Sequence, residues 1–142
     1  MEFFERCLDV SKRANDTDKE AECYQQIGLI YEQQGDLEAS IEYLNKFLDI
    51  CEETKNKVKA GQAHKKLAET YQKSGNIAQA IKHLEKVLAL AMEENNGPAK
   101  ANAALKLGLL YYQEGDIKRA SDYMSNHFDF LRGGEDGTQN QS

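Results

Sequence analysis

Three histidines and three cysteines are the side chains of this sequence best suited to metal binding or nucleophilic chemistry. None of the histidines, at positions 64, 83 and 127, has a second histidine or a cysteine three or four residues away, the spacing that puts two ligands on one helical face. No sequence signature for thiol activation surrounds the cysteines, Cys7, Cys23 and Cys51. The sequence therefore predicts no catalytic residue, no metal and no cofactor, and we expect a protein that is not an enzyme.

The positions that do recur are spaced 40 residues apart, as in a repeat protein. Each unit has a glycine followed by Asp or Asn, which predicts a helix that ends in a left-handed glycine and a second helix capped by the polar residue. A tyrosine and a small residue lie upstream of that turn, and another small residue follows it. The structural repeat positions are Gly28, Tyr31 and Gly35, then Ala68, Tyr71, Gly75 and Ala80, then Gly108, Tyr111, Gly115 and Ala120.

Apolar residues follow each turn at the i, i+3, i+4, i+7 spacing of a buried helical stripe. Subtracting 40 from the first stripe reaches Met1, Phe4 and Leu8, which predicts that residues 1–14 form the second helix of an earlier unit whose first helix is absent. We divide the rest into helix-turn-helix units at 17–54, 57–94 and 97–132. Residues 133–142, with three glycines and no apolar side chain, predict a disordered tail.

Composition and charge narrow the classes of partner. The net charge of −6 argues against nucleic acid and against an anionic membrane surface. The first residues lack a signal peptide, no stretch has the length of a membrane span, and the free thiols expected of three cysteines fit a reducing, cytoplasmic compartment. Residues 55–73 are a local exception, because they carry 6 basic and 1 acidic side chains; we call this segment the basic island.

The recurring small residue, tyrosine, glycine and second small residue resemble the tetratricopeptide repeat family. The resemblance implies an all-α, right-handed superhelical solenoid of about seven helices: one unpaired second helix and three helix-turn-helix repeats. Units of 40 residues are similar to those of Leu-Gly-Asn-repeat scaffolds and of ciliary and axonemal repeat proteins. That similarity implies a cytoskeletal or ciliary location within the cytoplasm.

In this family the first helices line a concave groove that binds a peptide or a helix of a partner protein. The resemblance implies a protein-protein interaction scaffold or adaptor, with a groove that is basic in its middle and apolar at one end. We therefore expect a partner segment of acidic character. The alternative is a solvated face in which Lys65 pairs with Glu69. The predicted groove residues are Gln25, Leu29, Gln62, Lys65, Lys66, Glu69, Lys73, Lys106, Leu109 and Tyr112.

Two further expectations concern the kind of partner. Chaperone-binding members of the family hold a terminal carboxylate with lysine and asparagine, whereas the matching positions here are Gln25, Leu29 and Lys66, so we expect no chaperone-tail clamp. Apolar side chains near both ends, including Phe3 and Phe128, leave open a structural element that self-associates end to end. A peptide-sensing regulatory module is the remaining alternative.

Overall fold

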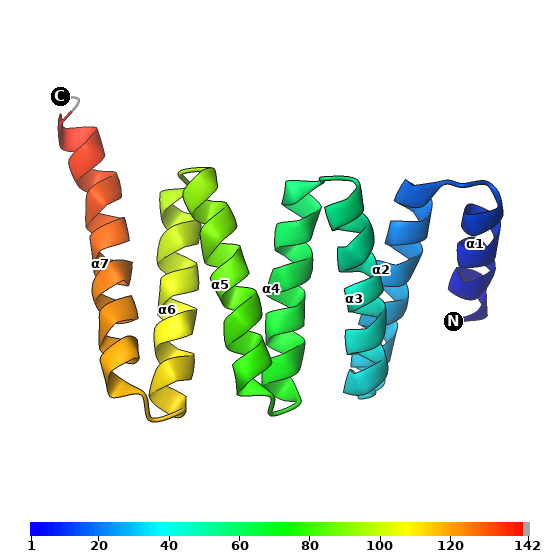
Figure 1. Cartoon of the computed structure of the whole chain (residues 1–142), viewed down its shortest axis with the longest axis horizontal. Coiled ribbons are helices and arrows are strands. Elements are labelled where there is room, and N and C mark those ends of the chain that lie inside the picture. The colour runs from blue at the N-terminus through cyan, green and yellow to red at the C-terminus, as the bar shows by residue number, and fades with distance from the viewer. Residues whose placement is uncertain (141–142) are drawn as a thin grey trace. The chain divides into compact units, whose positions relative to one another are not determined.

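In a computed structural model, the backbone of residues 1–140 and the side chains of residues 1–132 are described. These residues form seven helices and no strand, which confirms the predicted all-α class. The predicted disordered tail, 133–142, falls on residues whose side chains lie outside the described part, and it stays a prediction. The helices are α1 Glu2–Arg13, α2 Thr17–Gln33, α3 Leu37–Glu53, α4 Lys57–Lys73, α5 Ile77–Glu93, α6 Gly97–Gln113 and α7 Ile117–Asn140 (Figure 1).

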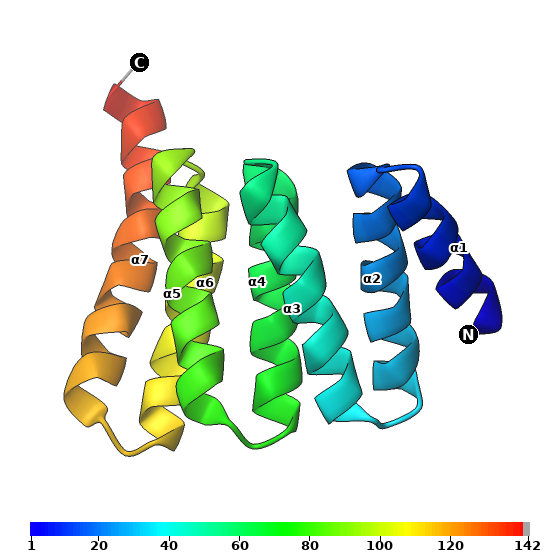
Figure 2. The same ribbon diagram turned by 45° about the vertical axis from the view of Figure 1, so that its right-hand side comes forward.

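The chain divides into two compact units, Met1–Asn76 with α1 to α4 and Ile77–Ser142 with α5 to α7. In the first unit, α1 packs on α2, α2 on α3 and α3 on α4; in the second, α5 packs on α6 and α6 on α7. Successive helices within each unit run antiparallel, as both views show (Figures 1 and 2). Each unit is thus a row of helices that pack on their neighbours in the sequence.

One type of joint connects all seven helices. The residue after the helix C-cap has positive φ: 83° at Gly35, 87° at Gly75 and 85° at Gly115, which confirms the left-handed turn predicted for these glycines. The amide of Gly35 bonds to the Glu32 carbonyl and that of Asp36 to the Tyr31 carbonyl, a Schellman pair that closes the helix end. The Asp36 carboxylate then accepts a bond from the Ala39 amide, which caps α3.

The joints between repeats have the same geometry without glycine. Asn15, Lys55 and Asn95 take φ of 54°, 57° and 53°. The Lys55 amide bonds to the Glu52 carbonyl, and the next residue, Asn56, caps α4 through the Lys59 amide. The joint therefore recurs every 20 residues, whereas the glycines recur only every 40.

The small repeat positions allow the paired helices to approach closely. A Cβ atom added to Gly28 on α2 would lie 3.0 Å from the Leu44 side chain on α3, and the buried Ser40 hydroxyl donates to the Gly28 carbonyl at 2.7 Å. On α6, a Cβ at Gly108 would lie 3.2 Å from Met124 and 3.3 Å from the Ala120 carbonyl oxygen. These contacts confirm that the small residues mark close helix packing.

Aromatic and aliphatic side chains fill the core of the first unit around Leu44 and Phe47, which are 1% and 2% exposed. Tyr31 stacks on Tyr43 beside this core, and Tyr111 stacks on Tyr123 in the second unit. His64 is buried, and the half-buried His127 donates from Nδ1 to the Ala101 carbonyl at 2.7 Å. The cysteines are free, with Cys23 and Cys51 buried and Cys7 half-buried.

Candidate functional site

The predicted groove residues fall into two sets, one in each compact unit, and each set forms a stripe along its helices. In the first unit, Gln25 and Leu29 are half-buried on α2, while α4 carries exposed Gln62 and Lys65. The remaining members on α4 lie at successive helical turns, so the stripes of α2 and α4 each occupy one helical face. These remaining members are Lys66, Glu69 and Lys73.

The carboxylate of Glu32 joins the two stripes. The Nζ atoms of Lys66 and Lys73 lie 3.0 Å and 3.2 Å from Glu32 Oε1. The Thr70 hydroxyl donates to Glu32 Oε2 at 3.1 Å, and Lys66 also lies 3.6 Å from Glu69. Because Glu32 belongs to α2 and its three partners to α4, this cluster ties the two helices together across their shared face. We call Glu32, Lys66, Thr70 and Lys73 the Glu32 cluster.

Burial and pairing act in opposite directions on the ionisation of the Glu32 cluster. The Glu32 side chain is only 14% exposed, and burial raises the pKa of its carboxyl. Hydrogen bonds from Lys66, Lys73 and Thr70 outweigh that burial, and the net pKa of Glu32 is lowered. Burial lowers the pKa of Lys66, but the bond and charge of Glu32 dominate and leave that pKa raised. The cluster therefore holds its members in their charged forms.

This arrangement changes the expectation for the basic island. Lys66 and Lys73, predicted to face an acidic partner, already contact an acidic side chain of the same chain. Glu69 pairs with Lys66, where the sequence alternative paired it with Lys65. The exposed Lys65 is then the cation of this stripe best placed to meet a partner.

Sequence reasoning placed Glu32 on the groove-facing stripe but missed its role, because the partners lie one helix pair further along the chain. A signal was available in the charge pattern. Glu32 is an acidic residue on the first-helix face, 34 residues before Lys66 and 41 before Lys73, close to the 40-residue repeat spacing. Thr70 gave no such signal, since its position aligns with the apolar residues Ile30 and Leu110.

The second unit carries the other predicted set on α6. Leu109 and Tyr112 are 52% and 67% exposed, three residues apart on one face of a helix whose other face is buried through Leu107, Leu110 and Ala104. Lys106 is half-buried one turn before Leu109. This face offers two apolar side chains beside a cation. Exposed apolar contacts of this kind supply most of the binding energy in protein interfaces.

The described residues contain no group of three His, Cys, Asp or Glu side chains placed to hold a metal ion. Nor does any described helix combine the length and apolar character that a bilayer crossing requires. The arranged groups of the two stripes are charged and apolar side chains on helical faces, which can contact another protein by ion pairing and apolar burial.

Comparison with known proteins gives a family and a set of structural neighbours. The family model described as tetratricopeptide repeat matches residues 2–53 and 60–129. No curated protein matches the sequence. Among solved structures, the chain is similar to BtubC (BKLC) from P. vanneervenii, with 18% identity and a TM-score of 0.80 over 94% of this chain. It spans only 56% of the length of BtubC.

Two further solved structures show the same fold. The chain is similar to the TPR domain of Arabidopsis FLU, with 18% identity, a TM-score of 0.70 and coverage of 82% of this chain and 98% of that domain. It is also similar to aspartyl phosphate phosphatase F from Bacillus subtilis, with 16% identity, a TM-score of 0.72 and coverage of 95% of this chain and 41% of that protein. At these identities the structures establish the fold alone. Since the repeat model accounts for most of the chain, in two segments that follow its repeats, this protein belongs to the tetratricopeptide repeat family.

Proposed function

We propose that this protein is a non-catalytic interaction scaffold that binds a peptide or helix of another protein on the exposed faces of its first helices. The observation that carries the proposal is the pair Leu109 and Tyr112, which remain more than half exposed on an α6 that is otherwise packed into the core. Leaving such side chains in water forgoes the free energy of burial, about 25 cal/mol for each Å² of apolar surface. A partner that covers them recovers that free energy.

The chemistry of this face suggests the chemistry of the partner. Leu109 and Tyr112 would anchor one or two apolar side chains, and Lys106 would attract an acidic residue one helical turn away. Charge complementarity of this kind speeds association and selects the partner more than it tightens the complex. The partner segment is therefore an apolar sequence flanked by acidic residues. In the first unit, Lys65 supports the same preference.

Quantitative affinity capture followed by mass spectrometry tests the proposal with matched variants. One variant carries Leu109→Ser and Tyr112→Ser; the control carries Ile117→Ser, which removes another apolar side chain of the same unit, one that is 59% exposed. We expect partner proteins that the control retains and the double variant loses. With a captured partner, the double variant should weaken binding by about tenfold or more, the size expected when anchor residues are truncated.

The competing functions give different results in the same experiment. If the double variant and the control lost the same partners, the α6 face would not be the binding site. Capture of only further copies of this chain, with a mass in light scattering that rises with concentration, would favour the self-associating structural element. Lys106→Glu separates the charge contribution, since it should slow association and flatten its dependence on salt. A cytoskeletal or ciliary setting stays a prediction that the identity of the partner would test.

A further inference from the structure

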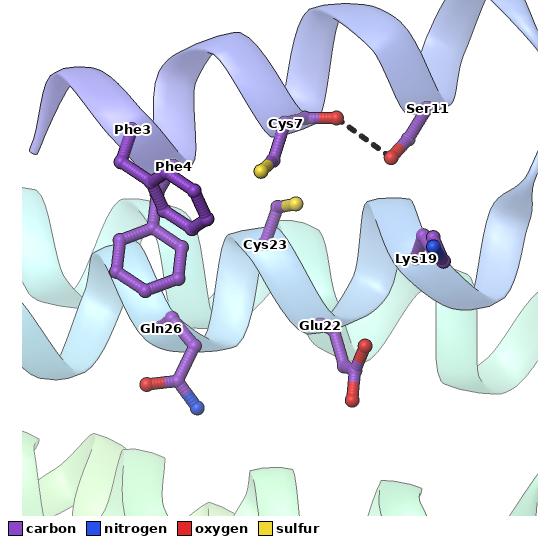
Figure 3. A pocket seen from close by; sticks show the side chains of 8 residues that line it. All are labelled: Phe3, Phe4, Cys7, Ser11, Lys19, Glu22, Cys23 and Gln26. Carbon is purple, nitrogen blue, oxygen red and sulfur yellow. Dashed lines mark hydrogen bonds between the residues drawn. The ribbon is translucent and has the colours of Figure 1, made fainter.

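A second surface lies at the other end of the first unit, in a pocket between α1 and α2. Its volume is about 290 Å³, and Figure 3 shows the residues that line it. Cys7 and Cys23 face each other at its centre, and the Ser11 hydroxyl donates to the Cys7 carbonyl at 2.7 Å. Burial, followed by the neighbouring Cys7, raises the pKa of the Cys23 thiol. The lining residues are Phe3, Phe4, Cys7, Ser11, Lys19, Glu22, Cys23 and Gln26.

The apolar wall of this pocket is uncovered where the matching wall of the next repeat is covered. Phe3 is 68% exposed, and Phe4 and Cys7 are half-buried. Forty residues further on, Leu44 and Phe47 take the places of Phe4 and Cys7 and are 1% and 2% exposed. The same position in the repeat is thus buried on α3 and open on α1.

On α3, the covering element is the first helix of the same repeat, α2. Gly28 leaves room for Leu44, which would lie 3.0 Å from an added Cβ atom. Tyr31, three residues later, stacks on Tyr43 with ring centroids 5.7 Å apart and planes 18° apart. The covering helix therefore presents a small residue to position 44 and an aromatic ring to position 43.

The pair α6 and α7 repeats this arrangement independently. Gly108 faces Met124, which would lie 3.2 Å from an added Cβ atom. Tyr111 stacks on Tyr123 at 5.6 Å with planes 7° apart. In both pairs, a small-x-x-Tyr sequence on the first helix receives two adjacent side chains of the second. On α1, the matching adjacent side chains are Phe4 and Phe3.

We propose that the α1–α2 pocket binds an amphipathic helix of a partner protein that carries a small-x-x-aromatic motif. The small residue lies on Phe4 and the aromatic ring stacks on Phe3, in the orientation that α2 takes on α3. A second copy of this chain is a poor source of that helix. The small residues of its three such motifs, Gly28, Ala68 and Gly108, are all buried in their own chain.

A tethered helix of known sequence tests the fit. Residues 16–40 are added directly before Met1, which supplies a cap, a Gly-x-x-Tyr helix and the turn in the register of the 40-residue repeat. Tethering raises the effective concentration to about the millimolar range, so even a weak docking site is occupied. The control fusion replaces the added copy of Gly28 with leucine, which removes the space for Phe4 and keeps the length and charge.

Alkylation of Cys7, mapped by mass spectrometry, reports on the pocket, and the buried Cys51 in the same unit is the internal reference. If the added helix is docked about nine-tenths of the time, Cys7 reacts about tenfold more slowly than in the unmodified chain. The leucine fusion should react at the unmodified rate. Equal rates in all three chains, or equal protection by both fusions, would overturn the proposal. So would a dimer of the unmodified chain in which Cys7 is already protected.

Discussion

Replacing Glu32 with glutamine tests whether the Glu32 cluster holds α2 to α4. The substitution keeps the shape of the side chain and removes the charge that Lys66 and Lys73 share. The amide oxygen of glutamine can accept one of the present bonds, but its NH2 group cannot accept the others. Thr70 keeps a partner, since its hydroxyl also lies 2.8 Å from the Lys66 carbonyl oxygen, and Lys66 keeps Glu69.

The size of the effect follows from the exposure of each member. An exposed ion pair contributes about 0 to 1 kcal/mol, and breaking a fully buried pair costs about 3 to 5 kcal/mol. Lys73 is 57% exposed and contributes little, whereas Glu32 and Lys66 are 14% and 29% exposed and lie between these limits. We expect Glu32→Gln to lower the free energy of unfolding by about 1 to 2 kcal/mol. For a chain of this length, the melting temperature should fall by about 3 to 6 °C.

The loss should depend on pH in a direction that the pKa of Glu32 fixes. Folding lowers that pKa from its ordinary value of 4.5, so the paired carboxylate stabilises the folded chain above 4.5. This contribution disappears as the pH falls through the lower, folded value. Thermal unfolding followed by circular dichroism, at pH 7 and in steps down to about pH 3.5, should therefore show the two proteins converging.

Glu38→Gln is the matched control, because Glu38 is an exposed acidic residue in the first turn of α3. It should cost at most a few tenths of a kcal/mol, through its interaction with the helix dipole. If Glu32→Gln and Glu38→Gln melted together at pH 7, the Glu32 cluster would not stabilise the fold. A deficit of the same size at every pH would assign the loss to packing and not to charge.

Three further predictions concern close packing and the joints, and each is checked by urea or thermal unfolding. Gly28→Val should destabilise by about 1 to 3 kcal/mol, since its side chain meets the buried Leu44, whereas Gly97→Ala, with nothing within 4 Å, should change little. Gly35→Ala should cost about 1 kcal/mol from backbone strain alone, because its φ is 83° and its surroundings are open. Lys55→Gly should have the opposite sign and stabilise by about 0.5 to 1 kcal/mol, as it relieves a lysine at φ 57°; a loss would mean that the lysine side chain contributes more than the strain costs.

The repeat glycines, the apolar stripes and the caps were enough to predict the helices and their close contacts. Each depends on local chemistry: Gly35 must turn, Asp36 must cap, and Gly28 must admit Leu44. The joints at Asn15 and Lys55 were recognised as boundaries, but their left-handed backbone was not predicted. Lysine has no intrinsic preference for that conformation, and the surrounding hydrogen bonds impose it.

The candidate site was less accessible to sequence reasoning, because it depends on which charged groups meet across helices. Lys66 and Lys73 have the composition of a free basic patch, and only the structure shows that Glu32 reaches them. The exposure of Tyr112 was predicted from the face of the helix on which it lies, and the structure confirms it. The openness of the α1 wall could be judged only by comparing the burial of Phe4 with that of Leu44.

Within each compact unit, the packed helix pairs described above are consecutive in the sequence. Loops of three residues therefore bring most partners together, and little chain entropy is lost in closing them. Proteins with such local contacts fold rapidly, and folding can begin at any hairpin and spread to the next. The same property makes length easy to vary. Copying or deleting a 40-residue stretch recreates contacts that already exist, so the number of repeats can change without a new core having to be invented.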